Sequence, residues 1–431
     1  MEKITAPRGT KDVLPSGAGE WAEVERAAAE TAGAYGYGRI RFPTFEYTEL
    51  FVRGVGGATD IVRKEMYTFE DKGGRSISLR PEGTASVVRA GVEHGLFGGA
   101  MPLKAYYIAP NFRYEKPQSG RLREHHQFGV ECFGASGPEA DAEVIALGRA
   151  FLRRAGVDGL SLKLNSIGCS GDGGAPGCRP AYRERLIEFL TPMAGELCAD
   201  CRERMIRSPL RVLDCKAEVC RAATAGAPEM SECLCAHCDA HRKAVERYLT
   251  LLGIPYENDG RLVRGLDYYN RTVFEFTAGD GEAAHAGTVL GGGRYDGLVE
   301  QLGGPATPAC GFGCGLERVL LARGGERAPK GGPALFMAIA GEPGSPADIA
   351  ARLMTDTLRA GGIWSEQELC GRSLKAQLKH ADRMGARYVM VIGDSEVESA
   401  RAELKRMSDG ARIPCAMDTG DITAAIGKDA L

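Results

Sequence analysis

The chain lacks long hydrophobic runs and has almost no excess of charge of either sign. Among its 431 residues the longest apolar runs, such as 334–340, are far shorter than the roughly 20 residues that a helix needs to span a bilayer. Residues 1–8 contain no apolar core of a signal peptide, so we expect a cytoplasmic protein without a membrane partner. Because 54 Lys and Arg residues face 57 Asp and Glu residues, a globally basic surface is excluded, and any nucleic-acid contact must be a local patch.

Aromatic residues are also scarce, at 7% of the chain, whereas the 59 glycines are about twice the usual share. Glycine at this frequency indicates many tight turns and close approaches between backbone and ligand. The hydrophobic fraction of 44% is sufficient for packed cores and excludes wholesale disorder. At roughly 100–200 residues per domain, the length predicts two to four domains.

Composition changes abruptly at two places along the chain. Nine of the 14 cysteines lie between Cys169 and Cys238, which predicts an inserted cysteine-rich module at about 169–245. A segment rich in glycine and proline then predicts an interdomain linker at 327–333. The linker separates a first domain over 1–326 from a second over 334–431.

The second domain alternates apolar strands with amphipathic helices. We expect strands at 334–340 and 388–392, and helices at 347–360 and 373–384. This alternation predicts a small α/β domain with a largely parallel sheet.

The first domain has a different pattern between residues 105 and 133, where apolar side chains recur at every second position. The polar stretch 116–126 interrupts this pattern, so we expect a hairpin with a loop of about eleven residues within an antiparallel sheet. Loops longer than the usual two to five residues of a hairpin are often functional.

The two faces of this hairpin differ in polarity. Residues two apart on a strand share a face, so Arg113 and Glu115 project together while the neighbouring aromatic residues, Phe112 and Tyr114, turn to the core. On the second strand Gln127 and Glu131 share a face, and Gly129 between them leaves room for a ligand. The pattern favours a polar pocket, with a solvated outer face as the alternative.

Several segments together resemble a known family. Three segments resemble the signature motifs of class II aminoacyl-tRNA synthetases. The first motif is similar to Tyr35-Gly36-Tyr37 leading to Phe42-Pro43, the second to Phe112-Arg113-Tyr114-Glu115, and the third to Gly311-Phe312-Gly313-Cys314-Gly315-Leu316-Glu317-Arg318. Two more specific segments are similar to the histidine-binding motifs of histidyl-tRNA synthetases. They are Leu262-Val263-Arg264-Gly265-Leu266-Asp267-Tyr268-Tyr269-Asn270-Arg271-Thr272 and Gly291-Gly292-Gly293-Arg294-Tyr295-Asp296. Two further segments also resemble that family, Ala6-Pro7-Arg8-Gly9-Thr10-Lys11-Asp12 and Arg80-Pro81-Glu82-Gly83-Thr84.

The resemblance runs almost end to end, and it implies both fold and activity. The implied fold is an α+β catalytic domain with an antiparallel sheet of the class II synthetase type, a cysteine-rich insertion and a C-terminal α/β anticodon-binding domain. The implied reaction activates L-histidine with ATP to histidyl-adenylate and pyrophosphate, then transfers histidine to the 3′ end of tRNA(His). Mg²⁺ would accompany ATP, and the first motif implies a homodimer.

The resemblance also implies the residues that handle ATP. Displacement at phosphorus needs in-line positioning and neutralised phosphate charge, which the planar fork of arginine supplies. Arg113 would bind the α-phosphate, and Arg264 would lie near the same phosphate and the histidine carboxylate. Arg318 would contact the γ-phosphate and Glu115 the adenine edge. His125 stands where many relatives have phenylalanine, and an imidazole can still stack on adenine.

Recognition of histidine requires acceptors for an ammonium group and hydrogen-bonding partners for an imidazole. A site built in this way rejects analogues that leave its polar groups unpaired. The resemblance implies that Glu82, Thr84 and Gln127 bind the α-amine and that Glu131 and Tyr269 bind the imidazole. The complete set of implied histidine-binding residues is Glu82, Gly83, Thr84, Gln127, Glu131, Tyr268, Tyr269 and Tyr295.

Two regions are implied to contact tRNA. The basic hairpin loop offers Gln118 and Arg123 to the acceptor end, where phosphate contacts give affinity and base contacts give specificity. In the second domain Lys375 and Lys379 are four apart and share a helix face, as expected for an anticodon-binding patch. Solvated surfaces are the alternative at both places.

The cysteine-rich module contains two CxxC pairs, Cys198 with Cys201 and Cys235 with Cys238. Four thiolates in two such pairs satisfy tetrahedral zinc, which stabilises small modules that lack a large core. Two interpretations stay open, one structural Zn²⁺ held by these four cysteines or reduced thiols without metal.

Two other functions fit parts of this pattern. One is the non-catalytic paralogue that regulates ATP phosphoribosyltransferase, which lacks the anticodon domain. The other is a class II ligase for proline or threonine, which the histidine-type motifs disfavour. Exchange of pyrophosphate into ATP across amino acids separates the three.

Overall fold

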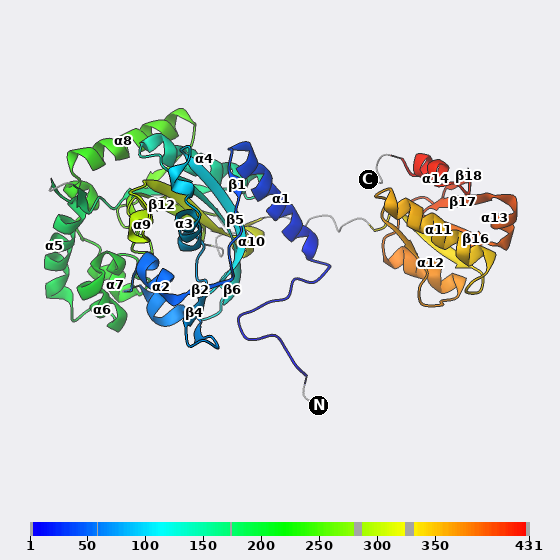
Figure 1. The fold of residues 1–431 in the computed structure, drawn as a ribbon, viewed down its shortest axis with the longest axis horizontal. Coiled ribbons are helices and arrows are strands. Elements are labelled where there is room, and N and C mark those ends of the chain that lie inside the picture. The colour runs from blue at the N-terminus through cyan, green and yellow to red at the C-terminus, as the bar shows by residue number, and fades with distance from the viewer. Residues whose placement is uncertain (1–2, 58, 173–174, 280–286, 324–331, 428–431) are drawn as a thin grey trace. The chain divides into compact units, whose positions relative to one another are not determined.

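The computed structural model consists of two compact units, Met1–Gly325 and Glu326–Leu431 (Figure 1). It describes residues 3–57, 59–172, 175–279, 287–323 and 332–427, so most of the expected linker at 327–333 lies outside the described residues. Within those described ranges, no helix combines the length and the apolar character needed to cross a bilayer.

The N-terminal unit is built on an eight-stranded sheet. Its five inner pairings are antiparallel, as the alternating hairpin pattern predicts, and only the two edge strands β1 and β10 pair in parallel with their neighbours. In sheet order the strands are β1 (Gly38–Arg39), β5 (Leu103–Phe112), β6 (Glu124–Phe133), β13 (Ala309–Gly315), β12 (Thr288–Arg294), β11 (Asn270–Thr277), β7 (Ser161–Ser166) and β10 (Glu257–Asn258).

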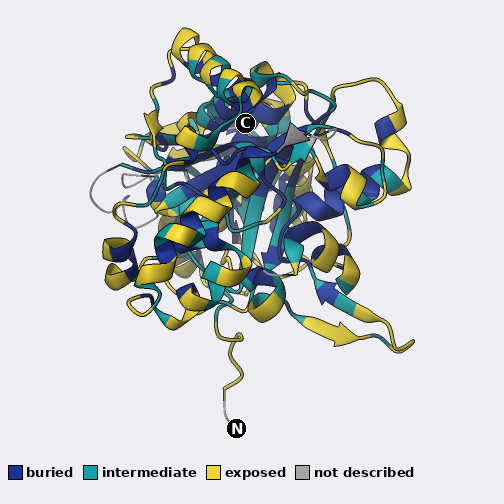
Figure 2. Ribbon diagram, turned by 90° about the vertical axis from the view of Figure 1, so that its left-hand side faces the viewer, coloured by how far each residue is buried: buried dark blue, intermediate teal, exposed yellow. Residues whose placement is uncertain are grey.

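One face of this sheet forms the main apolar core with the long helix α4 (Pro138–Arg154). Phe128 of β6 packs edge-on against Phe151 of α4, with ring centroids 4.8 Å apart, and against Phe312 of β13 at 5.5 Å. The helix begins with proline and two acidic residues in its first turn, which suit the unpaired N–H groups there. Figure 2 shows the strands as buried segments behind helices with exposed outer sides.

The remaining helical segments surround the sheet. They are α1 (Ala18–Ala34), α2 (Thr48–Phe51), η1 (Val52–Gly56), η2 (Ile61–Glu65), α3 (Thr84–Glu93), η3 (Leu96–Gly98), α9 (Leu298–Gln301) and α10 (Leu316–Ala322). A separate three-stranded antiparallel sheet has the order β2 (Phe45–Tyr47), β4 (Ser76–Leu79), β3 (Thr68–Glu70).

The cysteine-rich module is mostly helical and lies on the side of the sheet away from α1 (Figure 1). Its last helix extends to Leu251, beyond the expected end at about 245. Its elements are β8 (Gly171–Asp172), β9 (Ala175–Pro176), α5 (Cys178–Leu190), η4 (Thr191–Met193), α6 (Ala199–Arg207), η5 (Pro209–Val212), α7 (Glu218–Ala223), η6 (Met230–Cys233) and α8 (Ala236–Leu251).

The C-terminal unit has a five-stranded sheet in the order β15-β14-β16-β17-β18. The strands β14, β15 and β16 are parallel as predicted, but β17 runs antiparallel to both of its neighbours, so the sheet is mixed. The elements are β14 (Leu335–Ala340), α11 (Pro346–Ala360), β15 (Ser365–Gln367), α12 (Leu374–Arg383), β16 (Tyr388–Gly393), α13 (Asp394–Ser399), β17 (Arg401–Arg406), β18 (Arg412–Ala416) and α14 (Thr419–Ile426).

The hairpin prediction is wrong in two details. The first strand ends at Phe112 and the second begins at Glu124, so the loop is 113–123 rather than 116–126. Tyr114 therefore lies beyond the strand, and 55% of it is exposed instead of buried in the core. Its ring stacks beneath the guanidinium group of Arg123, whose Cζ lies 3.8 Å from the ring centroid.

Candidate functional site

The candidate site lies on the face of the eight-stranded sheet opposite α4. Neighbouring strands place Tyr107, Gly129, Gly313, Gly291 and Glu275 directly across from one another, from β5 to β11. The three central residues have no side chain. The sheet therefore presents a flat strip of backbone between a tyrosine and a glutamate.

Side chains from adjacent positions lie flat on this strip, because only a glycine leaves them space. An added Cβ atom would come within 2.0–2.4 Å of one of these side chains at each central glycine. The contacts are Gly129 with the Tyr107 ring at 2.2 Å, Gly313 with Gln127 Nε2 at 2.0 Å and Gly291 with Arg264 Nη1 at 2.4 Å. The room predicted beside Gly129 exists, but the Tyr107 ring fills it here.

Glu131 is the buried acid at one end of the strip. It is 1% exposed, accepts a hydrogen bond from Thr84 Oγ1 at 2.7 Å and accepts another from the Tyr295 hydroxyl. Burial raises the pKa of Glu131 to about 8, against the opposing effect of these two donors. The carboxyl group is therefore mostly protonated at neutral pH.

Glu82 stands at the start of α3, where the first turn of the helix has free N–H groups. Its carboxylate accepts hydrogen bonds from the backbone nitrogens of Thr84 and Ala85, each at 2.8 Å. Burial raises the pKa of Glu82, and the two backbone bonds work against that increase. Glycine is needed at position 83, because the Cβ atom of any larger residue there would lie 2.4 Å from the Tyr107 ring.

Three buried tyrosines surround Glu131. The ring centroids of Tyr268 and Tyr269 are 4.7 Å apart, and those of Tyr268 and Tyr295 are 5.4 Å apart. Burial raises the pKa of all three hydroxyl groups, so they are neutral donors at physiological pH. Gln127, on the same strand face as Glu131, accepts a hydrogen bond from Asn111 Nδ2 at 2.8 Å.

Arg264 connects the tyrosine end of the strip to its charged end. Its guanidinium carbon lies 5.8 Å from the centroid of the Tyr269 ring, and its Nη1 donates to Glu275. Burial lowers the pKa of Arg264, but Glu275, Tyr269 and Tyr268 together outweigh that effect and the net shift is upward. The arginine remains charged in a buried position.

Hydrogen bonds link Arg264 to a second arginine through β12. The other oxygen of Glu275 accepts from Thr288 Oγ1 at 2.7 Å, and the Thr288 carbonyl accepts from Arg318 Nη1 at 2.5 Å. Burial and the neighbouring charge of Arg121 lower the pKa of Arg318. The charged end of the site thus links Arg264 and Arg318 through Glu275 and Thr288.

Arg113, Glu115 and His125 lie at this same end. Arg113 Nε donates to the Pro81 carbonyl at 2.8 Å, and its Nη1 is 3.8 Å from Glu115 Oε1. Burial, Arg113 and Arg318 together lower the pKa of His125 to about 3. The imidazole is therefore neutral at physiological pH.

The loop residues predicted to contact tRNA differ in their surroundings. Gln118 is exposed, and its backbone pairs with Arg121 around Gly120. Arg123 is half-buried, and its Nε donates to the Glu115 carbonyl at 3.2 Å. Lys375 and Lys379 are both exposed on α12 of the C-terminal unit.

Sequence reasoning missed Tyr107, Asn111 and Glu275. Glu275 was detectable, because it is the single charged residue in the otherwise apolar run Val273–Phe276 of β11. Tyr107 and Asn111 could not be distinguished from ordinary core residues by their spacing. Their role follows from contacts with Gln127, which lies on the neighbouring strand.

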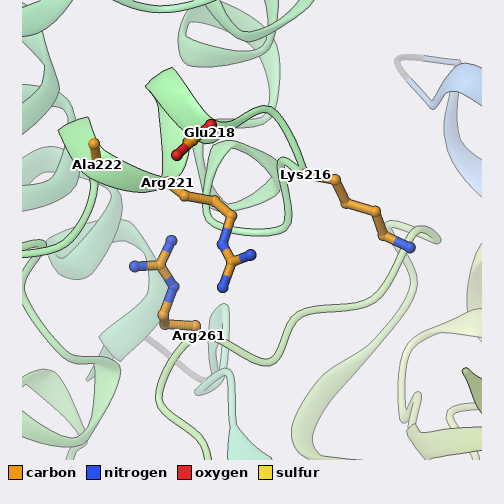
Figure 3. A pocket seen from close by; sticks show the side chains of 5 residues that line it. All are labelled: Lys216, Glu218, Arg221, Ala222 and Arg261. Atoms are coloured by element: carbon orange, nitrogen blue, oxygen red, sulfur yellow. The ribbon is translucent and has the colours of Figure 1, made fainter. Parts of the chain in front are cut away.

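A cavity of about 570 Å³ lies on the cysteine-rich module and includes none of the predicted site residues. It is lined by Lys216, Glu218, Arg221, Ala222 and Arg261. Figure 3 shows the guanidinium groups of Arg221 and Arg261 pointing toward one another. At the main site, Tyr107, Gln127 and Arg264 lie across the glycine floor.

The prediction of one metal site from the two CxxC pairs is wrong in its grouping. The Cys198–Cys201 pair lies with Cys215 and Cys220, whereas the Cys235–Cys238 pair lies with Cys169 and Cys178. In each group all four sulfur atoms are within 4.8 Å of one another. The spacing along the chain could not reveal that the helices sort the two pairs into different clusters.

Comparison with known families agrees with this geometry. The model of the histidyl-tRNA synthetase family matches residues 9–319, and that of an anticodon binding domain matches residues 346–426. The chain belongs to the histidyl-tRNA synthetase family. The implied class II fold, with its antiparallel sheet and C-terminal α/β unit, is confirmed.

Relatives within the family cover nearly the whole chain. The histidine–tRNA ligase of Desulforudis audaxviator is 50% identical over 99% of both chains, and that of Caldanaerobacter subterraneus is 50% identical over 94% of this chain and 95% of its own. The crystal structure of apo histidyl-tRNA synthetase from S. aureus has 38% identity and a TM-score of 0.81, covering 97% of this chain and 99% of that one.

The buried acid of this family member makes stability depend on pH. The folded chain releases the Glu131 proton near pH 8, whereas an ordinary glutamic acid releases it near 4.5. The folded state therefore loses stability as pH rises between these values. From pH 6 to pH 8 we expect the unfolding free energy of the wild type to fall by roughly 2 kcal/mol relative to Glu131→Gln.

Urea titrations at both pH values measure this difference. A Trp364→Phe background leaves Trp21 as the single tryptophan, so its fluorescence follows the N-terminal unit alone. The exposed-carboxyl variant Glu257→Gln serves as the control and should track the wild type. Equal changes with pH in the wild type and in Glu131→Gln would contradict the assigned protonation.

Proposed function

We propose that this chain acts as a histidine–tRNA ligase through the strip of backbone glycines described above. ATP activates the histidine carboxylate, and the activated acid is then transferred to the 3′ end of tRNA. The observation that carries this assignment is the contact between Arg264 and Tyr269. It joins a cationic end suited to phosphate with a phenolic and acidic end suited to an imidazole.

We assign adenylation to the cationic end. Arg113 and Arg264 would hold the α-phosphate and the attacking carboxylate in line, while Arg318 neutralises the outer phosphates. The neutral His125 ring would stack on adenine beside Glu115. Mg²⁺ prefers oxygen ligands and would offset phosphate charge, and the carboxylates of Glu115 and Glu275 lie among these arginines.

We assign histidine selection to the buried end. Glu131 and Tyr269 would pair with the two imidazole nitrogens, with Tyr268 and Tyr295 enclosing the ring. Glu82, Gly83, Thr84 and Gln127 would receive the ammonium group. Every one of these groups is already hydrogen-bonded or buried, so an amino acid that leaves them unpaired loses affinity.

For tRNA we infer two contact regions. Gln118 and Arg123 of the loop are near the cationic end and would meet the acceptor end, and Lys375 and Lys379 would meet the anticodon. The cavity with Arg221 and Arg261 adds positive charge on the module, which suits a phosphate backbone. We also infer that 1–326 carries the chemistry and the acceptor-end contacts, and that 334–431 binds the anticodon.

We infer a cytoplasmic enzyme, because all fourteen cysteines lie in the described ranges and none of them is joined in a disulfide. Free thiols in this number suit a reducing compartment.

We further infer that the functional form is a homodimer. One face of the small sheet gathers Phe45, Tyr47 and Phe69, which are 56%, 57% and 48% exposed, together with Ile77 and Leu79 opposite them. An exposed apolar patch of this kind marks an interaction surface. A second copy with the same patch covers it by two-fold symmetry.

The mass in solution tests this interface. Light scattering after gel filtration should give twice the chain mass of 46.0 kDa for the wild type. Phe69→Glu should weaken association at least about 30-fold, as expected when a charge enters an apolar interface centre. Leu251→Glu, another exposed apolar position at the end of α8, should leave the dimer intact. A wild type with the mass of one chain would refute the proposal.

Pyrophosphate exchange into ATP tests the activity itself. With each of the twenty amino acids in turn, we expect exchange with histidine to exceed that with any other by roughly 10³-fold or more. No exchange with any amino acid would indicate the regulatory paralogue. A preference for proline or threonine would indicate another class II ligase.

Arg264 is the residue whose removal should separate chemistry from tRNA binding. Arg264→Ala should reduce exchange by about 10²–10³-fold, because a buried group that stabilises transferred charge is lost. Filter binding of tRNA should weaken only modestly. Arg247→Ala, an exposed arginine on α8, is the matched control and should retain full exchange. Near-normal exchange in Arg264→Ala would contradict the assigned role.

A further inference from the structure

We propose that the cysteine-rich module holds two structural zinc ions, one in each of two separate tetrathiolate sites. Site A consists of Cys169, Cys178, Cys235 and Cys238, and site B consists of Cys198, Cys201, Cys215 and Cys220. Each site has two buried and two partly buried cysteines. The one other cysteine of the module, Cys233, belongs to neither site.

Site A joins the two ends of the module, because Cys169 and Cys178 lie near its start and Cys235 and Cys238 lie at the beginning of its last helix. Cys169 follows β7, Cys178 begins α5, and Cys235 and Cys238 lie at the start of α8. The sulfur atoms of Cys169 and Cys178 are 3.6 Å apart. Backbone N–H groups of Cys169 and Cys238 donate to sulfur atoms within the site, at 3.1 and 3.5 Å, as suits sulfur atoms that carry negative charge.

Site B has the same construction within the centre of the module. Cys198 and Cys201 begin α6, Cys215 follows η5, and Cys220 lies in α7. The Cys198 and Cys215 sulfur atoms are 3.9 Å apart, and the Cys198 N–H group donates to the Cys220 sulfur at 3.2 Å. Two such sites from independent segments are difficult to explain as chance packing of thiols.

The sulfur spacing matches a single tetrahedral ion. With zinc–sulfur bonds of about 2.3 Å, a regular tetrahedron places its sulfur atoms roughly 3.8 Å apart. The sulfur–sulfur distances of 3.6 Å in site A and 3.9 Å in site B lie on either side of that value. A disulfide would need sulfur atoms at about 2.0 Å and would use only two of the four cysteines. Four thiolates around one ion select zinc among the common divalent metals.

Each ion would add stability to that of the apolar cluster in the module, which includes Tyr182, Leu186 and Leu190. The module contains short helices joined by loops, and α6 and α7 together bury few large side chains. A metal ion fixes four chain positions at once, so the free energy of binding becomes free energy of folding. Site A would anchor the module to β7, whereas site B would organise the module internally.

Site A also lies directly behind the histidine-binding end of the main site. Arg179 follows Cys178, and its backbone N–H group donates to the Cys169 carbonyl at 2.9 Å. The guanidinium group of the same residue donates to the Tyr269 carbonyl and, at 3.3 Å, to the Ile167 carbonyl. A metal ion at site A would therefore hold the segment that carries Tyr269.

Metal analysis of the full chain, purified without added zinc, tests the proposal. We expect about two zinc ions per chain by mass spectrometry, and about one in Cys178→Ser or Cys201→Ser, which remove one ligand from site A or site B. The double variant should retain almost none. Cys233→Ser is the matched control, because it changes a module cysteine outside both sites, and it should keep both ions.

A second measurement on the wild type stays decisive even if the serine variants do not fold. Titration with an organomercurial in the presence of a zinc-binding dye should release two zinc ions as thiols are blocked. Folded protein with well under one zinc ion per chain would overturn the proposal. Iron with visible absorbance, or equal loss of zinc in Cys233→Ser, would overturn it as well.

Discussion

The site depends on a steric constraint in three neighbouring strands, which have glycine where they cross its centre. Gly129, Gly313 and Gly291 form a strip on which longer side chains can lie flat. Any larger residue at Gly313 would displace Gln127, and one at Gly291 would displace Arg264. An antiparallel sheet normally fills this layer with core side chains, and here the layer is kept for recognition groups instead.

This strip separates two electrostatic environments within a short distance. At one end burial keeps Glu131 and the surrounding tyrosines largely uncharged. At the other end Arg264 stays charged because Glu275 lies beside it. A single pocket can therefore present neutral hydrogen-bonding groups to a heterocycle and fixed positive charge to phosphate, as the proposed reaction requires.

Much of the architecture was predictable because period-two alternation identifies strand faces. Gln127 and Glu131 do share one face of β6, with Phe128 in the opposite core. The placement of Tyr114 failed because the strand ends at Phe112, and alternation does not indicate where a strand stops. Side-chain contacts between different segments, such as the one between Glu275 and Arg264, were not predicted either, because sequence spacing does not encode them.

The cysteines illustrate the same boundary between local pattern and tertiary structure. Each CxxC pair was recognisable by its spacing, but the partners of each pair come from other segments of the module. Only the folded arrangement assigns Cys169 to one group and Cys215 to the other. A pattern in sequence can thus identify ligand types well before it identifies which ligands meet.

The pairing of Arg264 with Glu275 has a consequence for selectivity among anions. Arg264 is already paired with Glu275 before any phosphate binds. The free energy that a phosphate gains from Arg264 is therefore the difference between the new ion pair and the existing one. By this comparison, untethered orthophosphate would gain less from Arg264 than from a solvated arginine. In the proposed function, a nucleotide held by its base and outer phosphates would reach the same arginine at a high effective concentration, so the internal carboxylate would disfavour untethered ions.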